Sequence, residues 1–82
     1  MITAVIIDDE KKSRDTLQGL LTNYCPNVKI LGEADGFRTG VEAIKKLKPE
    51  TVFLDIQMPD GSGFKVLEEI DEINFEVIFA TA

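Results

Sequence analysis

The feature that most constrains the fold is the alternation of short β-branched apolar runs with segments whose apolar residues recur at helical spacing. The apolar runs, expected as strands, are residues 4–7, 28–34, 51–54 and 75–80. The segments of helical spacing carry Leu17, Leu20, Leu21 and Tyr24, then Phe37, Val41, Ile44 and Leu47, then Phe64, Leu67 and Ile70. This βαβαβαβ order predicts one α/β domain with a three-layer parallel sheet and right-handed crossovers. The expected strand order is 2-1-3-4, with the first helix on one face and the other two helices on the opposite face.

Composition excludes several classes of function. The 82 residues carry 9 Lys and Arg against 15 Asp and Glu, a net charge of −6, which argues against direct binding of nucleic acid or an anionic membrane surface. The basic pairs Lys11-Lys12 and Lys45-Lys46 are interpreted as solvated helix faces. With no histidine and only Cys25, the chain offers no imidazole base, internal disulfide or zinc knuckle. No signal peptide or membrane span is apparent, so we expect a cytoplasmic location.

Acidic residues gather where the expected strands end. Asp8 and Asp9 follow the first strand and Asp55 follows the third, so the topology brings three carboxylates to one sheet edge, with Thr81 after the fourth strand. Such a cluster favours a hard cation bound by oxygen, Mg²⁺ or Mn²⁺. Two other interpretations remain open from the residues alone: Asp8 or Asp9 caps the first helix, and Asp55 forms a turn ahead of Pro-Asp-Gly.

Three blocks of sequence resemble the receiver domain of two-component response regulators, which has a flavodoxin-like (CheY-like) fold. The blocks are residues 5–10 (VIIDDE), residues 53–64 (FLDIQMPDGSGF) and residues 79–82 (FATA), and the resemblance extends over residues 1–82. Residues 1–10 and 20–36, together with the middle block, look most like receivers attached to LytTR-type DNA-binding domains. Binding of DNA is then implied only for an effector domain in a longer parent protein.

The resemblance implies a role for each site residue. Asp55 would be the phospho-acceptor, and Asp8, Asp9, Asp55 and the backbone carbonyl of Gln57 would hold Mg²⁺. Thr81 would be the hydroxyl residue that reports phosphorylation. The implied phosphoryl donor is a sensor histidine kinase, and the domain is a signalling switch rather than an enzyme, one that at most assists its own phosphotransfer and dephosphorylation.

Two other functions compete with this one. Receivers usually continue with a helix, a fifth strand that ends in a lysine, and a last helix, and these elements are absent from residues 1–82. Their absence leaves open a receiver-like interaction or dimerisation scaffold without phosphotransfer. A phosphohydrolase of the haloacid dehalogenase type also uses a strand-end aspartate with Mg²⁺. That class has a second aspartate two residues after the nucleophile, and in this chain Gln57 occupies that position.

Counting helices against sheet faces predicts an exposed apolar surface. The first helix alone covers one face of a four-stranded sheet, so half of that face is expected to stay open over the third and fourth strands. The residues expected there are Phe53, Phe75, Val77, Ile78 and Phe79. An apolar patch beside an unpaired strand edge favours association, so we expect either a longer chain or a homodimer that covers this face or edge.

Overall fold

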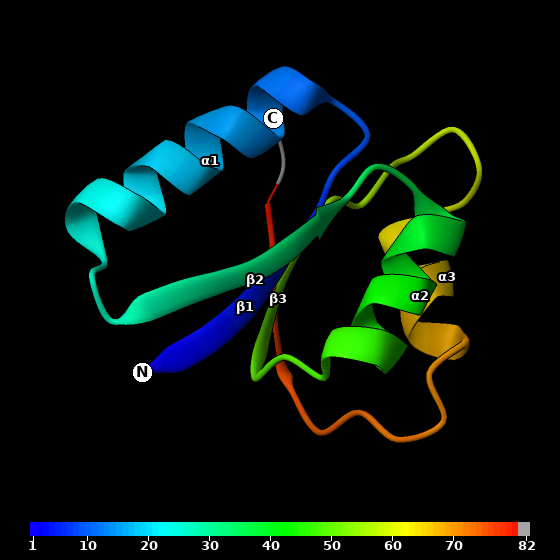
Figure 1. Ribbon diagram of the computed structural model, residues 1–82. Coiled ribbons are helices and arrows are strands. Elements are labelled where there is room, and N and C mark those ends of the chain that lie inside the picture. The colour runs from blue at the N-terminus through cyan, green and yellow to red at the C-terminus, as the bar shows by residue number, and fades with distance from the viewer. Residues whose placement is uncertain (81–82) are drawn as a thin grey trace.

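The computed structural model describes residues 1–80, which form seven elements in the predicted order (Figure 1). The strands are β1 (Ile2–Ile7), β2 (Val28–Ala34), β3 (Thr51–Leu54) and β4 (Glu76–Phe79). The helices are α1 (Lys11–Tyr24), α2 (Phe37–Leu47) and α3 (Gly63–Glu68).

The strands form one parallel sheet in the order β2-β1-β3-β4, as predicted. The central strand β1 has neighbours on both sides, and its residues 4–7 are at most 1% exposed. This burial on both faces explains why that segment is continuously apolar rather than alternating. β1 starts at Ile2, two residues before the predicted start, because the Ile2 N–H donates to the Asn27 carbonyl at 2.7 Å and extends the ladder.

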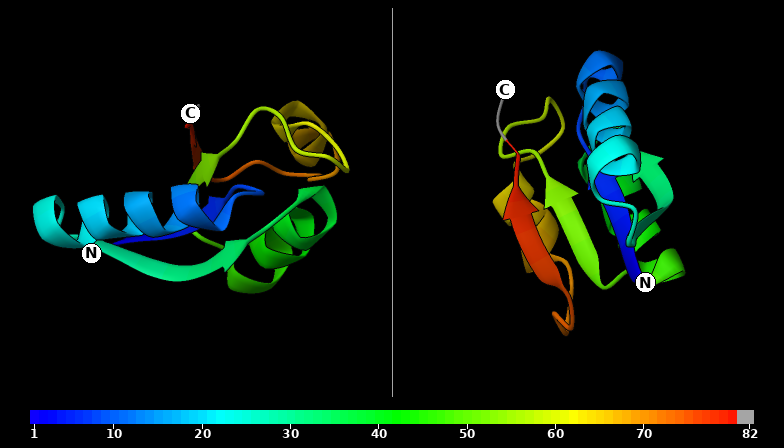
Figure 2. Two further views of the ribbon diagram at one scale, coloured as in Figure 1. Left: turned by 90° about the horizontal axis from the view of Figure 1, so that it is seen from above. Right: turned by 90° about the vertical axis from the view of Figure 1, so that its left-hand side faces the viewer.

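The helices lie in two layers, which confirms the flavodoxin-like three-layer architecture. Figures 1 and 2 show α1 on one side of the sheet and α2 with α3 on the other. Side chains from β1 and β3 pack against the α2 and α3 face, where the core contains Val5, Ile7, Ala34, Ile44, Val52, Leu54, Met58 and Val66. On the opposite face, Leu21 is the buried residue that α1 contributes to the core.

Local signals in the sequence set the helix ends. α2 ends at Leu47, because the next residue, Lys48, adopts φ 48° and the following Pro49 cannot continue the helix. α3 begins after Ser62, whose hydroxyl accepts from the Lys65 N–H at 3.1 Å. It ends before Ile70, earlier than the apolar spacing predicts, because the Ile70 N–H bonds three residues back, to Leu67, at 3.2 Å and tightens the last turn.

On the side of the sheet that α1 covers, part of the sheet is open, as predicted, but fewer apolar residues line this open part than the sequence analysis predicts. Phe53 pairs in register with Ile6 and Ile78, so these side chains project toward α1, and Ile78 is 46% exposed. No helix among residues 1–80 covers β3 and β4 on that side (Figure 2, right). The prediction was wrong for Phe75, Val77 and Phe79. Phe75 and Val77 are partly buried and pack against the core, and the centroid of the Phe79 ring lies 5.1 Å from that of the Phe64 ring of α3.

Two further expectations concern surfaces. Lys11, Lys12, Lys45 and Lys46 are all exposed, as predicted for solvated helix faces. Among residues 1–80, no helix combines the length and the hydropathy that crossing a bilayer demands. Association of two copies through the open face or the β4 edge stays a prediction.

Candidate functional site

Three carboxylates meet at the edge of the sheet where β1 and β3 end. Ile7 and Leu54 are register partners at the ends of these strands, so Asp8 and Asp55 emerge side by side, followed by Asp9. One carboxylate oxygen from each of the three aspartates lies within 4.8 Å of the other two, and all three residues are partly buried. The topology therefore brings together the acidic residues that the sequence singled out.

The environment of Asp55 disfavours its charged form. Burial raises the pKa of Asp55, and the neighbouring Asp8 and Asp9 charges raise this pKa further. The Gln57 N–H donates to Asp55 Oδ1 at 3.3 Å and lowers the pKa, but the net direction is upward. A cation at this edge would neutralise the repulsion that the fold concentrates here.

The segment between β1 and α1 holds Asp8 without making it a helix cap. The Asp8 N–H donates to the Ala34 carbonyl of β2 at 3.0 Å, and Asp8 Oδ1 accepts from the Glu10 N–H at 2.9 Å. The N-cap position of α1 belongs to Glu10, whose side chain makes no capping hydrogen bond. The alternative in which Asp8 or Asp9 caps the first helix is therefore wrong. The turn interpretation of Asp55 and its place in the acidic cluster are both correct, because its contact with Gln57 closes a local turn.

Asp60 tethers the loop between β3 and α3 to the start of α2. Its carboxylate accepts from the Phe37 N–H at 2.7 Å and from the Arg38 N–H at 3.3 Å, which lowers the pKa of Asp60. A Cβ at Gly36 would lie 2.9 Å from Asp60 Oδ1, so the absence of a side chain there permits the approach. In the sequence, Asp60 stands out only as the middle residue of the Pro-Asp-Gly turn. An unassigned carboxylate in a Pro-Asp-Gly turn was the only signal available.

Gly63 brings the start of α3 against the phospho-acceptor candidate. Its N–H donates to the Ile56 carbonyl at 2.8 Å, and a Cβ at this position would overlap the backbone carbonyl oxygen of Asp55. The close approach requires glycine because that oxygen belongs to the backbone. Gly63 therefore helps to define where Asp55 lies.

Two predicted site residues remain: the structure describes Gln57 but not Thr81. Gln57 is exposed in the loop that follows Asp55, and its backbone N–H contacts the Asp55 carboxylate. Thr81 lies outside the described residues. The donor set fits a hard divalent cation, because three clustered carboxylates supply oxygen ligands and their partial exposure leaves room for water ligands.

Comparison with known proteins identifies the family. Residues 4–82 match the response regulator receiver domain. The chain belongs to this family. The structure resembles the response regulator domain of Thermotoga maritima CheB, with a TM-score of 0.89 and 27% identity over 99% of this chain and 60% of that one. It also resembles the signal receiver domain of the putative response regulator NarL from Mycobacterium tuberculosis, with a TM-score of 0.89, 28% identity and coverage of 99% and 66%.

Sequence relatives of this receiver domain are longer regulators. The chain is 42% identical to an uncharacterized response regulatory protein of Vibrio cholerae. It is 38% identical to the sensory transduction protein LytT of Bacillus anthracis and 37% identical to the transcriptional regulatory protein BtsR of Escherichia coli. The matches cover all of this chain but only 34–35% of each relative, so the chain spans about a third of their length. These relatives agree with the resemblance to LytTR-type response regulators.

Proposed function

We propose that Asp55 is the phospho-acceptor of this receiver domain. The observation that supports the proposal most strongly is the position of Asp55 at the end of β3, with two further carboxylates within 4.8 Å. A carboxylate oxygen of Asp55 attacks the phosphorus, an O–P bond forms, and the bond from phosphorus to the donor breaks as the donor leaves with its electron pair. With a phosphorylated histidine of a sensor kinase as donor, the bond that breaks is N–P.

Asp8, Asp9 and Asp55 would hold Mg²⁺ or Mn²⁺, with the Gln57 carbonyl as a further ligand. A bound divalent cation supplies charge neutralisation for the transferring phosphoryl oxygens. Without it, a phosphoryl group with roughly two negative charges would lie beside two carboxylates. The residues of the acidic cluster therefore make phosphorylation depend on the metal.

The signal would follow from the change in charge. Phosphorylation replaces the single negative charge of Asp55 by about two and adds three strong acceptor oxygens. Thr81 is the hydroxyl residue proposed to donate to them. In the full-length protein, a cytoplasmic regulator of this type would pass the change to a DNA-binding effector domain, and the receiver, with its net charge of −6, would not itself bind the DNA. The domain would be a signalling switch and no enzyme in the ordinary sense.

Phosphate incorporation tests the proposal. The full-length protein that contains residues 1–82 is incubated with acetyl phosphate, with and without Mg²⁺, and its intact mass is measured. We expect one phosphoryl group per chain, added only with Mg²⁺, and none in Asp55→Asn. Asp15→Asn is the control, because Asp15 lies on α1 in an exposed ion pair with Lys11. Unchanged incorporation in Asp55→Asn would refute the proposal, and absence of incorporation in the wild type would favour a scaffold role.

A further inference from the structure

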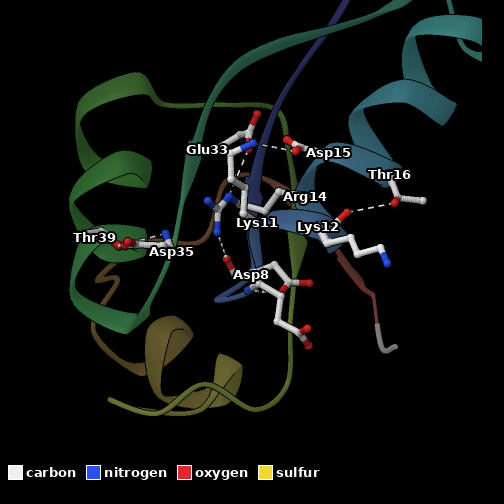
Figure 3. Close-up of polar contacts among 10 residues, drawn as sticks. Asp8, Lys11, Lys12, Arg14, Asp15, Thr16, Glu33, Asp35 and Thr39 are labelled. Atoms are coloured by element: carbon white, nitrogen blue, oxygen red, sulfur yellow. Dashed lines mark hydrogen bonds and ion pairs between the residues drawn. The ribbon is translucent and has the colours of Figure 1, made fainter.

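Arg14 joins three segments of the chain beside the acidic cluster. It is the fourth residue of α1, and its side chain is only 16% exposed. Its Nη1 donates to the backbone carbonyl of Asp8 at 2.8 Å, and its Nε donates to Glu33 Oε1 on β2 at 3.1 Å. Figure 3 shows the Arg14 side chain reaching from α1 toward both partners. One guanidinium therefore links α1, the end of β2 and the residue that starts the acidic segment.

The contact with Arg14 completes the hydrogen bonding of Asp8. The Asp8 N–H is held by Ala34, and its carboxylate by the Glu10 N–H. The Arg14 guanidinium is the side-chain donor that binds the remaining backbone group, the carbonyl. This carbonyl belongs to the peptide unit that leads into Asp9, so its orientation helps to set the direction in which the Asp9 side chain emerges.

The planar guanidinium suits this task better than a lysine. Its donors leave one rigid plane at fixed angles, so Nη1 and Nε bind two acceptors at once and fix their separation. A lysine ammonium is a single point on a flexible chain. The pairing of Arg14 with Glu33 also orients the guanidinium, which is largely shielded from solvent.

We propose that Arg14 is a positioning residue for the metal ligands Asp8 and Asp9, acting through its two-point contact with the Asp8 carbonyl and Glu33. The inference rests on the proposed metal site and adds a residue to it. Partners that orient metal ligands in this way typically contribute about tenfold or more to metal affinity.

The sign of the effect separates positioning from simple electrostatics. Removal of a positive charge near an acidic cluster strengthens its attraction for a cation. Loss of positioning has the opposite effect, because the ligands must then be ordered when the metal binds. Arg14→Met is therefore expected to bind divalent cations more weakly, even though its charge change alone favours tighter binding.

Mn²⁺ is the probe, and water proton relaxation measures its dissociation constant in the full-length protein. Arg14→Met is expected to raise this constant about tenfold. Arg14→Lys keeps the charge but loses the two-point contact, so it is expected to raise the constant about threefold. Lys11→Met is the matched control: it removes one positive charge from the first turn of α1 and the exposed pair with Asp15, and it leaves the Asp8 contacts intact. Its constant is expected to stay within about twofold of wild type.

The outcomes distinguish this inference from the proposed function. Wild-type affinity in a folded Arg14→Met, or in Arg14→Lys if the methionine variant fails to fold, would overturn the positioning role alone. An equal loss of affinity in Lys11→Met would also overturn it. Absence of Mn²⁺ binding by the wild-type protein would overturn the metal site and this inference with it. Phosphate incorporation supplies a second readout: in Arg14→Met, a higher Mg²⁺ concentration is expected to restore incorporation to the wild-type level.

Discussion

Neutralising Asp55 is expected to stabilise the folded domain when no metal is present. In Asp55→Asn the side chain keeps nearly the same shape and still accepts from the Gln57 N–H, but it carries no charge. The repulsion from Asp8 and Asp9 and the cost of burying a charge, which together raise the pKa of Asp55, are both removed. Stability should therefore increase at neutral pH.

The size of this effect follows from the geometry of the cluster. The three clustered carboxylate oxygens, one from each aspartate, lie at most 4.8 Å from one another. Two unit charges at a separation of 4.8 Å repel by about 0.9 kcal/mol in water. Asp55 faces two such charges, and salt screening of partly exposed groups reduces the sum of about 1.7 kcal/mol to about 1 kcal/mol. For a domain of this size, about 1 kcal/mol raises the melting temperature by about 4–8 °C.

The dependence on pH has a defined sign. Because the folded-state pKa of Asp55 lies above its ordinary value of 3.8, the folded protein holds this proton more tightly than the unfolded chain does. The wild type therefore loses stability as pH rises from 3.8 through the folded-state pKa. The advantage of Asp55→Asn should appear over that interval and vanish below pH 3.8.

Divalent metal should reduce or reverse the advantage. A cation at about ten times its dissociation constant stabilises the wild type by about 1.4 kcal/mol, and the variant, with one charged ligand fewer, gains less. Thermal unfolding followed by circular dichroism, with and without Mg²⁺, measures both effects. Asp71→Asn, an exposed carboxylate between α3 and β4, is the charge-matched control. An Asp55→Asn variant no more stable than wild type without metal, or a difference unaffected by Mg²⁺, would refute the reasoning.

Three other predictions concern the loops and the open face. Gly63→Ala is expected to lower the melting temperature and to weaken Mn²⁺ binding, because the added Cβ overlaps the Asp55 carbonyl oxygen. Gly19→Ala on α1 is the control: its added Cβ has no atom within 4 Å, so it should stabilise the domain by up to about 1 kcal/mol. Equal effects of the two substitutions on the melting temperature would contradict this assignment. Asp60→Ala is expected to lower the melting temperature at pH 7, and the difference should shrink below pH 3.8, because a carboxylate with a depressed pKa loses its contribution as pH falls through the folded-state value. A difference that persists unchanged at low pH would contradict the tether. A protein made only of residues 1–82 is expected to associate in sedimentation experiments through the surface that includes Phe53 and Ile78, and a monodisperse monomer would show that this surface tolerates solvent.

Local periodicity was sufficient to predict the order of the elements, and the topology rules for parallel sheets then supplied the strand order. The apolar run of β1 and the helix break at Pro49 act over short distances in sequence, and chirality then limits the crossovers. The assignment of Phe75, Val77 and Phe79 to the open face was wrong because side chains alternate along a strand. The registers Val52 to Val77 and Leu54 to Phe79 direct the last two toward α3.

The acidic cluster was predictable because its members directly follow strands whose ends share one sheet edge. The contacts that hold it were not predictable in this way. Arg14 reaches Glu33, 19 positions away, and Asp60 reaches Phe37, 23 positions away. Neither pair has a sequence spacing that indicates contact, since both depend on how α1 and the β3–α3 loop pack against the rest of the domain.

Identification of the carboxylate that carries the phosphoryl group is the most direct test of the central claim. The full-length protein is phosphorylated with acetyl phosphate and Mg²⁺, the acyl phosphate is reduced with borohydride to an alcohol, and peptide mass spectrometry locates the reduced residue. We predict reduction at Asp55 alone, with none in protein incubated without Mg²⁺. Reduction at Asp8, Asp9 or Asp60 in place of Asp55 would contradict the account.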